Sequence, residues 1–445
     1  MNHLKRIINI VLLYMLMNYI FVFYMESGSL FLKIIILLAL ITYYIYFNII
    51  PRSDKINNDR LKIMIGGYDL IIISGLCLFF ESILYIVIAL NNANETLLVL
   101  LIVNGLLSLI LLSITFINGY IRIYTTSREL GIVLRIFTLL FWWVPILNFI
   151  FIFKSCSIIK REFNYEIIKY NRNERRKDIK VCKTKYPIIL VHGIFFRDFK
   201  MFNYWGRIPK ELELNGADIY YGNQQSSLSV EDSSLELKKR IDQVLFESGA
   251  KKVNIIAHSK GGLDARYAIS MLDMGKKVAS LTTINTPHYG CNFAKESLDK
   301  VPQKLVNRVV KWYNTIFTKL GDEKPDFYRG IKDLTPEKCE ELNKILKNKR
   351  NVLYQSVGSI LNNSKSTSFP LNISYKIIKT IDGDNDGLVY EESMKWGNYL
   401  GTILTHSSKG ISHGDMIDLT RKNIIDFDVC EYYVQLVKDL KDKEL

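Results

Sequence analysis

The chain has 445 residues, enough for two or three domains, and 49% of its residues are hydrophobic. These are concentrated in the first 153 residues, which excludes a single ordinary soluble domain. The formal net charge of +14 makes nucleic acid a candidate partner. The basic residues form no helical stripe with interleaved aromatic residues, however, so we expect no nucleic acid to bind. Many lie beside apolar segments, where they suit anionic lipid headgroups.

Four segments of the N-terminal part are long and apolar enough to cross a bilayer. They lie at 7–25, 29–50, 68–90 and 96–118. A basic pair precedes the first segment, as in a signal peptide, but immediate continuation into further apolar segments favours a membrane anchor. The sequence therefore predicts a multi-pass membrane domain.

Along this domain, loops that contain lysine or arginine alternate with loops that contain neither. The loops at 26–29 and 91–95 contain neither residue type. The basic clusters lie in the other loops and beyond residue 153, at Lys5, Arg6, Arg52, Lys55, Arg60, Lys62, Arg122, Arg128, Lys154, Lys160 and Arg161. With four spans every cluster lies on one side, which the positive-inside rule makes cytoplasmic.

A fifth apolar run, 132–153, contains Arg135 and Pro145. It either spans the membrane or lies in the interface as a bent helix, and the charge distribution favours the interface. Asp69 and Glu81 lie within the third predicted span and raise a transport function. No repeat or pair of broken helices supports transport, so we expect Asp69 near the interface and Glu81 paired with a neighbouring helix.

Three domains follow from these patterns. We expect a transmembrane helical domain at 1–153, a basic linker helix at 154–185 and a third domain at 186–445. In the third domain short apolar runs alternate with helical patterns, which predicts an α/β fold with a mostly parallel sheet and helices on both faces. Expected strands lie at 188–191, 217–221, 253–258, 278–287, 352–358 and 374–381, and expected helices at 208–214, 233–248, 263–274 and 428–442.

The sequence VNIIAHSKGGLDARY predicts a strand, a sharp turn and a helix, with Ser259 at the tip. A serine hydroxyl becomes an effective nucleophile where a base can reach it and backbone N–H groups face the oxyanion. Small residues such as Gly261 allow such a turn, because strand and helix otherwise collide. Ser259 is the candidate nucleophile, with His258 and Gly261 supporting the turn.

Acyl transfer by serine needs a histidine base and a carboxylate, and in this fold class the order is serine, acid, histidine. For the base we prefer His413, in a glycine-bounded loop before the last helix, over His406. His288 follows a neighbouring strand and is expected to line the site or cap a turn. For the acid we prefer Asp386, followed by glycine, with Asp384 as the alternative.

An oxyanion hole needs two backbone donors. The first is the N–H of Lys260, directly after the nucleophile. The second is the N–H of Ile194, because His192 and Gly193 end the first strand and let the backbone approach closely. These residues complete the predicted site.

Residues 291–350 interrupt the alternation of strands and helices. An amphipathic stripe runs through this insertion, at Val301, Leu305, Val309, Trp312, Ile316 and Leu320. The insertion is either an ordinary packing helix or a lid over an apolar cleft, and we favour the lid.

In order along the chain, YPIILVHGI, FNYWGRIPKELELNGADIYY, KKVNIIAHSKGGLDARY, INTPHYG, NDGLV and SHGDMIDL make residues 186–445 resemble the bacterial triacylglycerol lipases of the α/β-hydrolase superfamily. The resemblance implies Ser259, Asp386 and His413 as catalytic residues. The resemblance also makes a structural calcium near Asp415 a candidate, but Leu419 occupies the position of one of its side-chain ligands. We therefore expect no metal or other cofactor. The six cysteines lack metal-ligand spacing and are expected to be reduced thiols.

The sequence thus predicts a membrane-anchored serine lipase or esterase that hydrolyses carboxylic esters of membrane lipids, either acylglycerols or phospholipids. The expected location is the cell membrane, with the catalytic domain on the cytoplasmic face. Two alternatives remain: an acyltransferase or thioesterase with the same three residues, and an inactive membrane scaffold or sensor.

Overall fold

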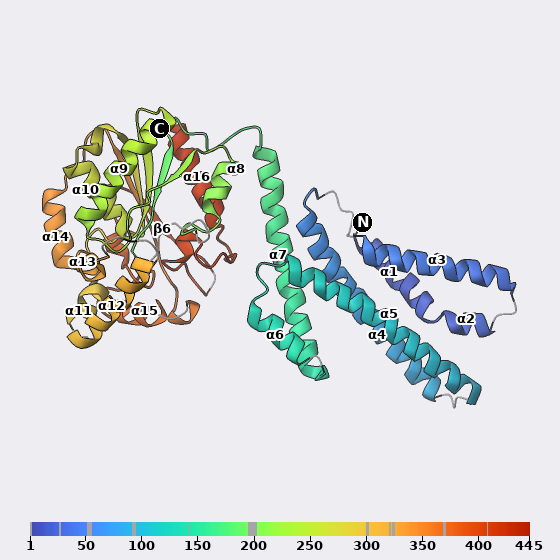
Figure 1. Cartoon of the computed structure of the whole chain (residues 1–445). Helices are drawn as coiled ribbons and strands as arrows, with labels where there is room; N and C mark the ends of the chain where they lie inside the picture. Colours follow the sequence, from blue (N-terminus) through green and yellow to red (C-terminus); the bar gives the residue numbers. More distant parts are fainter. Residues whose placement is uncertain are drawn as a thin grey trace. The chain divides into compact units, whose positions relative to one another are not determined.

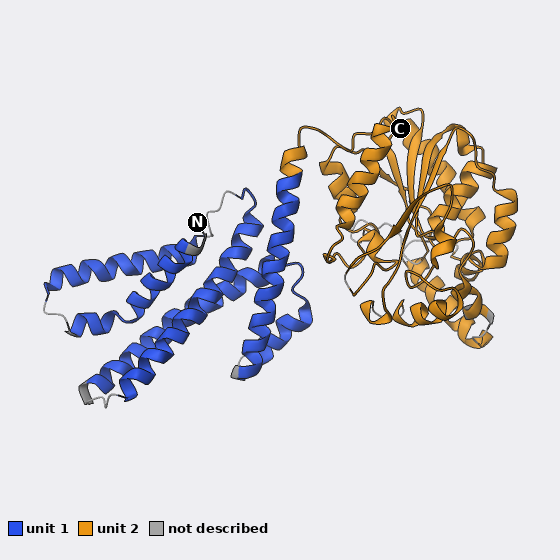
Figure 2. Ribbon diagram, turned by 180° about the vertical axis from the view of Figure 1, so that it is seen from behind, with its two compact units in different colours: residues 1–172 blue, residues 173–445 orange. Residues whose placement is uncertain are grey.

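The computed structural model describes the chain except at residues 1, 26–27, 51–55, 91–94, 142, 195–202, 300–301, 320–321, 323–324, 368–370 and 407. It divides into two compact units, Met1–Arg172 and Asn173–Leu445 (Figure 2). Unit 1 is helical, whereas unit 2 contains a β-sheet with helices on both faces (Figure 1).

The helices of unit 1 follow the apolar segments of the sequence. Three of them are long and apolar enough to cross a membrane: α3, α4 from Asp59, and α5 within Leu97–Thr126. They cover the predicted spans 29–50, 68–90 and 96–118. The predicted span 7–25 is instead divided at Asn18 into two shorter helices. The helices are α1 (Asn2–Met17), α2 (Tyr19–Met25), α3 (Leu30–Ile49), α4 (Asp59–Leu90), α5 (Glu95–Thr126), α6 (Ile132–Leu140) and α7 (Pro145–Arg176).

Glu81 of α4 is almost fully buried and contacts the neighbouring helices, as expected. Its carboxylate accepts hydrogen bonds from the Nδ2 of Asn18 at 2.9 Å and the Nδ2 of Asn104 at 2.8 Å. The Ser108 hydroxyl donates a third at 3.0 Å. These hydrogen bonds join α4 to α5 and to the α1–α2 junction inside an apolar bundle.

The segment 132–153 is bent. Helix α6 ends at Leu140, and α7 begins at Pro145, a residue suited to the first helical position because it has no N–H to satisfy. Helix α7 then continues without a break to Arg176. The predicted linker helix is therefore the C-terminal part of a longer helix that already begins within the fifth apolar run.

Six parallel strands form the sheet of unit 2, in the order β2-β1-β3-β4-β5-β6. The predicted α/β-hydrolase fold class is confirmed, with β3 between β1 and β4 in the middle of the sheet. The strands are β1 (Ile188–Val191), β2 (Ile219–Tyr221), β3 (Val253–His258), β4 (Val278–Ile284), β5 (Leu353–Ser359) and β6 (Asn398–Ile403).

Alternate residues of the central strands serve two separate cores, because successive side chains of a strand point to opposite faces. Leu190 and Ile256 pack against α8 and α16, whereas Val191 and Ile255 pack against α9 and α10. Figure 1 shows these two helix layers on either side of the sheet. The helices are α8 (Ile208–Leu214), α9 (Val230–Ser248), α10 (Lys260–Met271) and α16 (Val429–Asp442).

The insertion between β4 and β5 contains four helices. On α12 the buried side is formed by Val306 and Phe317, whereas the predicted stripe faces outward: Leu305, Val309 and Trp312 are all exposed. Two further members of the predicted stripe, Val301 and Leu320, lie outside the described residues. The helices are α11 (Asn292–Asp299), α12 (Gln303–Lys319), α13 (Phe327–Lys332) and α14 (Pro336–Ile345).

The expected strand at 374–381 is wrong, because this segment lies in helix α15 (Leu371–Ile381). Its buried residues Tyr375 and Ile378 are three apart and share one helix face. The sixth strand is β6, which the sequence analysis did not predict. It lies at the edge of the sheet and none of its residues is fully buried, so it lacks the apolar run of a central strand.

Candidate active site

The predicted site residues gather at the carboxyl ends of the central strands, where parallel α/β sheets bind their ligands. Val191, the last residue of β1, pairs with Ala257 of β3, and His258 pairs with Ile284, the last residue of β4. The loops that follow β1, β3 and β4 therefore leave the sheet side by side. They bring His192, Ser259 and Asn285 to the same edge of the sheet.

Ser259 occupies the turn between β3 and α10 with a positive φ of 55°. Such a conformation is uncommon and strained for a residue with a side chain, and strain of this kind clusters at functional sites. Two hydrogen bonds hold the turn: the Ser259 N–H donates to Ile284 at 2.9 Å, and the Thr286 hydroxyl donates to the Ser259 carbonyl at 2.8 Å. The serine is thus fixed by β4 and the loop after it.

Two glycines allow the segments around Ser259 to approach each other. A Cβ on Gly193 would lie 2.8 Å from the Cβ of Ser259, and one on Gly261 would collide with the His192 carbonyl. The loop after β1 therefore contacts the serine turn directly. Ile194 follows Gly193 and is buried, so the predicted oxyanion donors Ile194 and Lys260 belong to two segments that meet at Ser259.

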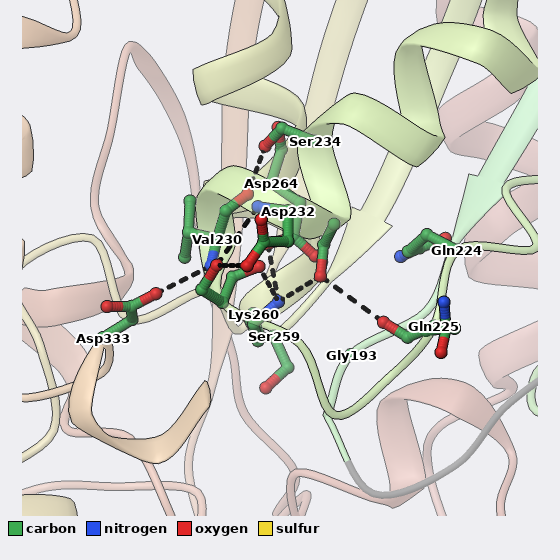
Figure 3. A network of polar contacts seen from close by, with 12 residues as sticks. Gly193, Gln224, Gln225, Val230, Asp232, Ser234, Ser259, Lys260, Asp264 and Asp333 are labelled. Atoms are coloured by element: carbon green, nitrogen blue, oxygen red, sulfur yellow. Dashed lines mark hydrogen bonds and ion pairs between the residues drawn. The ribbon is translucent and has the colours of Figure 1, made fainter. Parts of the chain in front are cut away.

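The Lys260 side chain is buried in a polar network behind the turn (Figure 3). Its ammonium donates to Asp264 at 2.8 Å and to the Ser233 hydroxyl at 2.9 Å. Figure 3 shows the Ser259 side chain directed away from this network. Burial raises the pKa of Asp264 to about 7, although the Lys260 charge opposes the shift. Lys260 thus joins α10 to α9 through its side chain, independently of its backbone N–H.

Asp386 and His413 are in direct contact. The His413 Nδ1 lies 2.6 Å from an Asp386 carboxylate oxygen, and the His413 N–H donates to the Asp386 carbonyl at 2.9 Å. Asp386 is fully buried, and the backbone N–H groups of Leu388 and Val389 each donate to its other oxygen at 2.8 Å. The carboxylate is therefore held in one orientation toward the imidazole.

The structure separates these two residues from the alternatives. Asp384 is half-exposed and forms an ion pair with Lys379. His406 is exposed. His288 is buried, and one nitrogen of its ring lies 3.1 Å from the Arg266 guanidinium. Burial lowers the pKa of His288 well below its usual value. Among the candidates only Asp386 and His413 form a carboxylate–imidazole pair.

His258 connects His413 to the serine turn. Its Nε2 lies 3.2 Å from the His413 carbonyl and its Nδ1 lies 2.7 Å from the Tyr204 hydroxyl. The two histidine rings have centroids 4.4 Å apart, which places His413 beside the residue that precedes Ser259. Complete burial lowers the pKa of His258 well below its usual value, so this ring stays neutral.

Two residues that support the site were missed in the sequence analysis. Asn285 donates from its amide to Asp386 at 2.7 Å, and thereby fixes the carboxylate oxygen that contacts His413. Tyr204 packs between the rings of His192 and His258. Both lie in runs that carry the family resemblance, but those runs assign them no role. Asn285 lies near the end of the predicted strand 278–287 and directly follows β4, and a polar residue in that place is a signal for the active edge of the sheet.

The surroundings of Asp415 do not fit a calcium ion. One carboxylate oxygen accepts from the N–H and the hydroxyl of Ser412, at 3.0 and 2.7 Å, and Lys409 also contacts this group. A calcium ligand set needs several oxygens without donors already bound to them. Within the described residues no cluster of three or more histidine, cysteine or acidic side chains could hold a metal.

The six cysteines are buried and form no disulfide with one another. In unit 2, burial raises the pKa of Cys182, Cys291 and Cys339 to about 12 each. A thiol with such a pKa is protonated at neutral pH and is a poor nucleophile. These cysteines are therefore structural, and the serine is the candidate nucleophile of the site.

Comparison with known proteins is consistent with this geometry. A triacylglycerol lipase of Pseudarthrobacter phenanthrenivorans is 37% identical over 145 residues, which is 31% of this chain and 45% of the relative. Triacylglycerol lipase 2 of Saccharomyces cerevisiae is 28% identical over 260 residues, covering 54% of this chain and 74% of the relative. Unit 2 is thus similar in sequence to triacylglycerol lipases of bacteria and yeast. The chain spans less than half of the length of the triacylglycerol lipases of Pseudarthrobacter phenanthrenivorans and Burkholderia plantarii.

Two further comparisons concern the same part of the chain. The profile of the palmitoyl protein thioesterase family matches residues 187–366. Among solved structures, the mature lipase BlEst2 of Bacillus licheniformis is similar at 19% identity with a TM-score of 0.42, over 57% of this chain and 92% of that one.

Proposed function

We propose that the protein is a membrane-anchored serine hydrolase that cleaves carboxylic ester bonds of lipids. The contact between Asp386 and His413, at the sheet edge that also holds Ser259, carries this proposal. Similarity to triacylglycerol lipases supports ester hydrolysis as the reaction. The three long apolar helices of unit 1 support membrane anchoring.

In the proposed reaction, the Ser259 oxygen attacks the acyl carbonyl while the free ring nitrogen of His413 takes the hydroxyl proton. Asp386 holds the ring through Nδ1 and stabilises the imidazolium that forms. The N–H groups of Ile194 and Lys260 donate to the oxyanion. His413 then returns its proton to the leaving alcohol, and water cleaves the acyl-enzyme by the same steps in reverse order.

The proposed substrates are acylglycerols or phospholipids of the membrane in which unit 1 is anchored. Anchoring raises the local concentration of such lipids, since enzyme and substrate then share one bilayer. Vesicle lipids and short soluble esters, offered separately to the purified full chain, test this substrate class. Cleavage of soluble esters alone would contradict the lipid substrate and leave ester hydrolysis in place.

Covalent labelling with a fluorophosphonate tests the nucleophile. We expect the folded full chain to be labelled at Ser259, and the Ser259→Ala variant to lose this label. His413→Gln should slow labelling strongly, because the base that removes the proton is gone. The matched control is His406→Gln, which changes an exposed histidine and should label at the parent rate. Equal labelling of both histidine variants would refute the assignment of His413.

A thioesterase is the second candidate function, because the palmitoyl protein thioesterase profile matches residues 187–366. The same acyl-enzyme would form, with a thiol in place of the alcohol as leaving group. Palmitoyl thioester and palmitoyl ester substrates with matched leaving-group size distinguish the two. A large preference in kcat/KM for the thioester, abolished in Ser259→Ala, would favour the thioesterase.

A further inference from the structure

A cavity of about 210 Å³ lies inside unit 1, between α1, α3, α4 and α5. Lys5 and Arg6 of α1 and Arg122 of α5 line it together with one carboxylate, Asp69 of α4. Three cationic groups thus face one anionic group. The cavity is separate from the serine site, which lies wholly in unit 2.

Arg122 is the strongest sign of a missing anion. Its side chain is 8% exposed, and among the described residues its guanidinium donates only to neutral groups: the carbonyls of Asn48 and Ile49 and the side chain of Asn118. The carbonyls at the end of α3 supply the negative end of a helix dipole, equivalent to about half an elementary charge. Burying a full charge is costly unless it is paired. The end of α3 alone therefore leaves part of the positive charge of Arg122 unbalanced.

Arg6 and Lys5 can also donate further hydrogen bonds. The Arg6 Nη2 pairs with Asp69, but its Nε is buried and has no hydrogen-bond partner among the described residues. Lys5 is exposed at the rim of the cavity. A buried N–H without a partner costs free energy, which an acceptor oxygen in the cavity would recover. Both side chains can therefore donate to one anionic group.

The rest of the lining suits the part of a lipid next to its headgroup. Tyr43 and Tyr46 of α3 stand beside the cations, and the Tyr43 hydroxyl is held by Asn9 at 2.6 Å. Apolar side chains, including Phe47 and Ile73, complete the walls. Tyrosines are enriched at the membrane interface, where one end of a side chain is apolar and the other is wet.

We propose that this cavity binds the phosphate of an anionic phospholipid, with Arg6, Arg122 and Lys5 contacting the phosphate oxygens. Basic pockets between transmembrane helices bind such headgroups on the cytoplasmic side. The cavity lies at the helix ends that adjoin the basic loops, since it includes the start of α1, the end of α3 and the end of α5. The proposal requires unit 1 to be embedded in a bilayer, and it is independent of ester hydrolysis.

Native mass spectrometry of the full chain in detergent tests this site. The Ser259→Ala background is used so that bound lipid is not consumed. The chain is offered equal amounts of phosphatidylglycerol and phosphatidylcholine with identical acyl chains. We expect mainly phosphatidylglycerol adducts, and a loss of this preference of about tenfold in Arg6→Gln, because charge-assisted hydrogen bonds contribute at least 1.4 kcal/mol, or about a factor of ten.

Lys5→Gln changes an exposed side chain and keeps the test valid if Arg6→Gln fails to fold. The matched control is Lys160→Gln, which removes an exposed charge from α7 outside the cavity. Equal adducts of both lipids, or an equal loss in Lys160→Gln and both cavity variants, would overturn the proposal. Excess inorganic phosphate identifies the source of the ligand. Displacement of the lipid indicates that the phosphate alone suffices, and retention indicates that the whole headgroup region is recognised.

Discussion

Asp386 and Asp384 stand two residues apart but lie in very different surroundings. Asp386 is fully buried, and N–H groups of Asn285, Leu388 and Val389 donate hydrogen bonds to its two carboxylate oxygens. Asp384 is half-exposed and pairs with Lys379 on the surface. The difference in their environments therefore makes only Asp386 suitable for orienting His413.

We expect Asp386→Asn to lower kcat for ester hydrolysis by about 10⁴-fold, as an amide in this position favours the wrong imidazole tautomer. Asp384→Asn is the matched control and should keep the parent rate, because surface ion pairs contribute little. Steady-state hydrolysis of a soluble ester by both full-length variants measures this. If both variants lost activity equally, the loop as a whole rather than the Asp386 carboxylate would be required.

The Asp264 carboxyl is expected to give unit 2 a pH-dependent stability. Its usual pKa of 3.8 is raised to about 7 in the folded chain by desolvation. Between these two values the folded state holds a proton that the unfolded state has released. Stability therefore falls as the pH rises through this window, since it decreases wherever the native state binds more protons.

We expect Asp264→Asn to flatten this part of the stability profile, because asparagine does not titrate. The measurement is the apparent Tm of unit 2, followed by tryptophan fluorescence of the full chain in detergent, from about pH 4 to about pH 7. Asp242→Asn is the control, since Asp242 is a half-exposed carboxylate that pairs with Lys277. An unchanged slope in Asp264→Asn would show that other groups cause the pH dependence.

Helix α12 presents an apolar face that nothing in the described part of unit 2 covers. Trp312 is 60% exposed, and Val309 and Leu305 lie one and two turns before it on the same face. The helix also carries lysine and arginine residues but no acidic residue. An amphipathic helix of this composition suits the surface of an anionic bilayer.

We expect Trp312→Ser to lower the rate on lipid vesicles several-fold while the rate on soluble esters stays the same. Losing the contact of a large aromatic side chain with lipid weakens binding to the vesicle but leaves the chemistry intact. Phe246→Ser is the control, because Phe246 on α9 is 90% exposed. Equal effects of the two variants on vesicles would show that α12 has no special role there.

The central strands and their helices could be predicted because they carry long apolar signals. Every residue of β1, β3 and β4 is buried, so these strands read as mainly apolar runs: β1 is wholly apolar, and β3 and β4 are interrupted by a few polar residues. Helix α15 could not be distinguished from a strand: Ile373, Tyr375 and Ile377 alternate with polar residues, although only Tyr375 of the three is buried. Strand β6 was missed because an edge strand needs little apolar surface.

At the site, Ser259, Asp386 and His413 could be predicted from residue type, loop position and chain order. The contacts that hold them could not. Asn285 meets Asp386 across 101 residues of sequence only because β4 and β5 are neighbours in the sheet. The neutral state of His258 likewise depends on complete burial, which a single residue in a motif does not reveal.

At the scale of the whole molecule, Glu162 of α7 determines how the chain leaves the bundle of unit 1. Its buried carboxylate accepts from Arg60 at 2.8 Å, from the Ser127 hydroxyl at 2.6 Å and from the N–H of Arg128 at 3.0 Å. Arg60 lies at the start of α4, and the other two follow the end of α5. Glu162 therefore lies at the same end of the bundle as these two helix ends.

This contact bears on the bent segment formed by α6 and the start of α7. If residues 132–153 crossed the bilayer once, Glu162 would emerge at the opposite end from Ser127, about 30 Å away. The hydrogen bond between the Ser127 hydroxyl and the Glu162 carboxylate excludes such a separation. We therefore infer that the segment enters and returns on one side, and that the basic residues of α7 stay on the side of Arg60 and Arg128, which the positive-inside rule predicts to be cytoplasmic.

We accordingly expect a reporter fused after Leu445 to be cytoplasmic. Green fluorescent protein at this position should fluoresce and alkaline phosphatase should be inactive, because the former matures in the cytoplasm and the latter needs an oxidising compartment for its disulfides. A fusion in the loop at 91–95, which contains no lysine or arginine, is the control and should give the opposite pair of results. An active phosphatase after Leu445 would place unit 2 outside, and the proposed substrates would then be lipids of the outer leaflet.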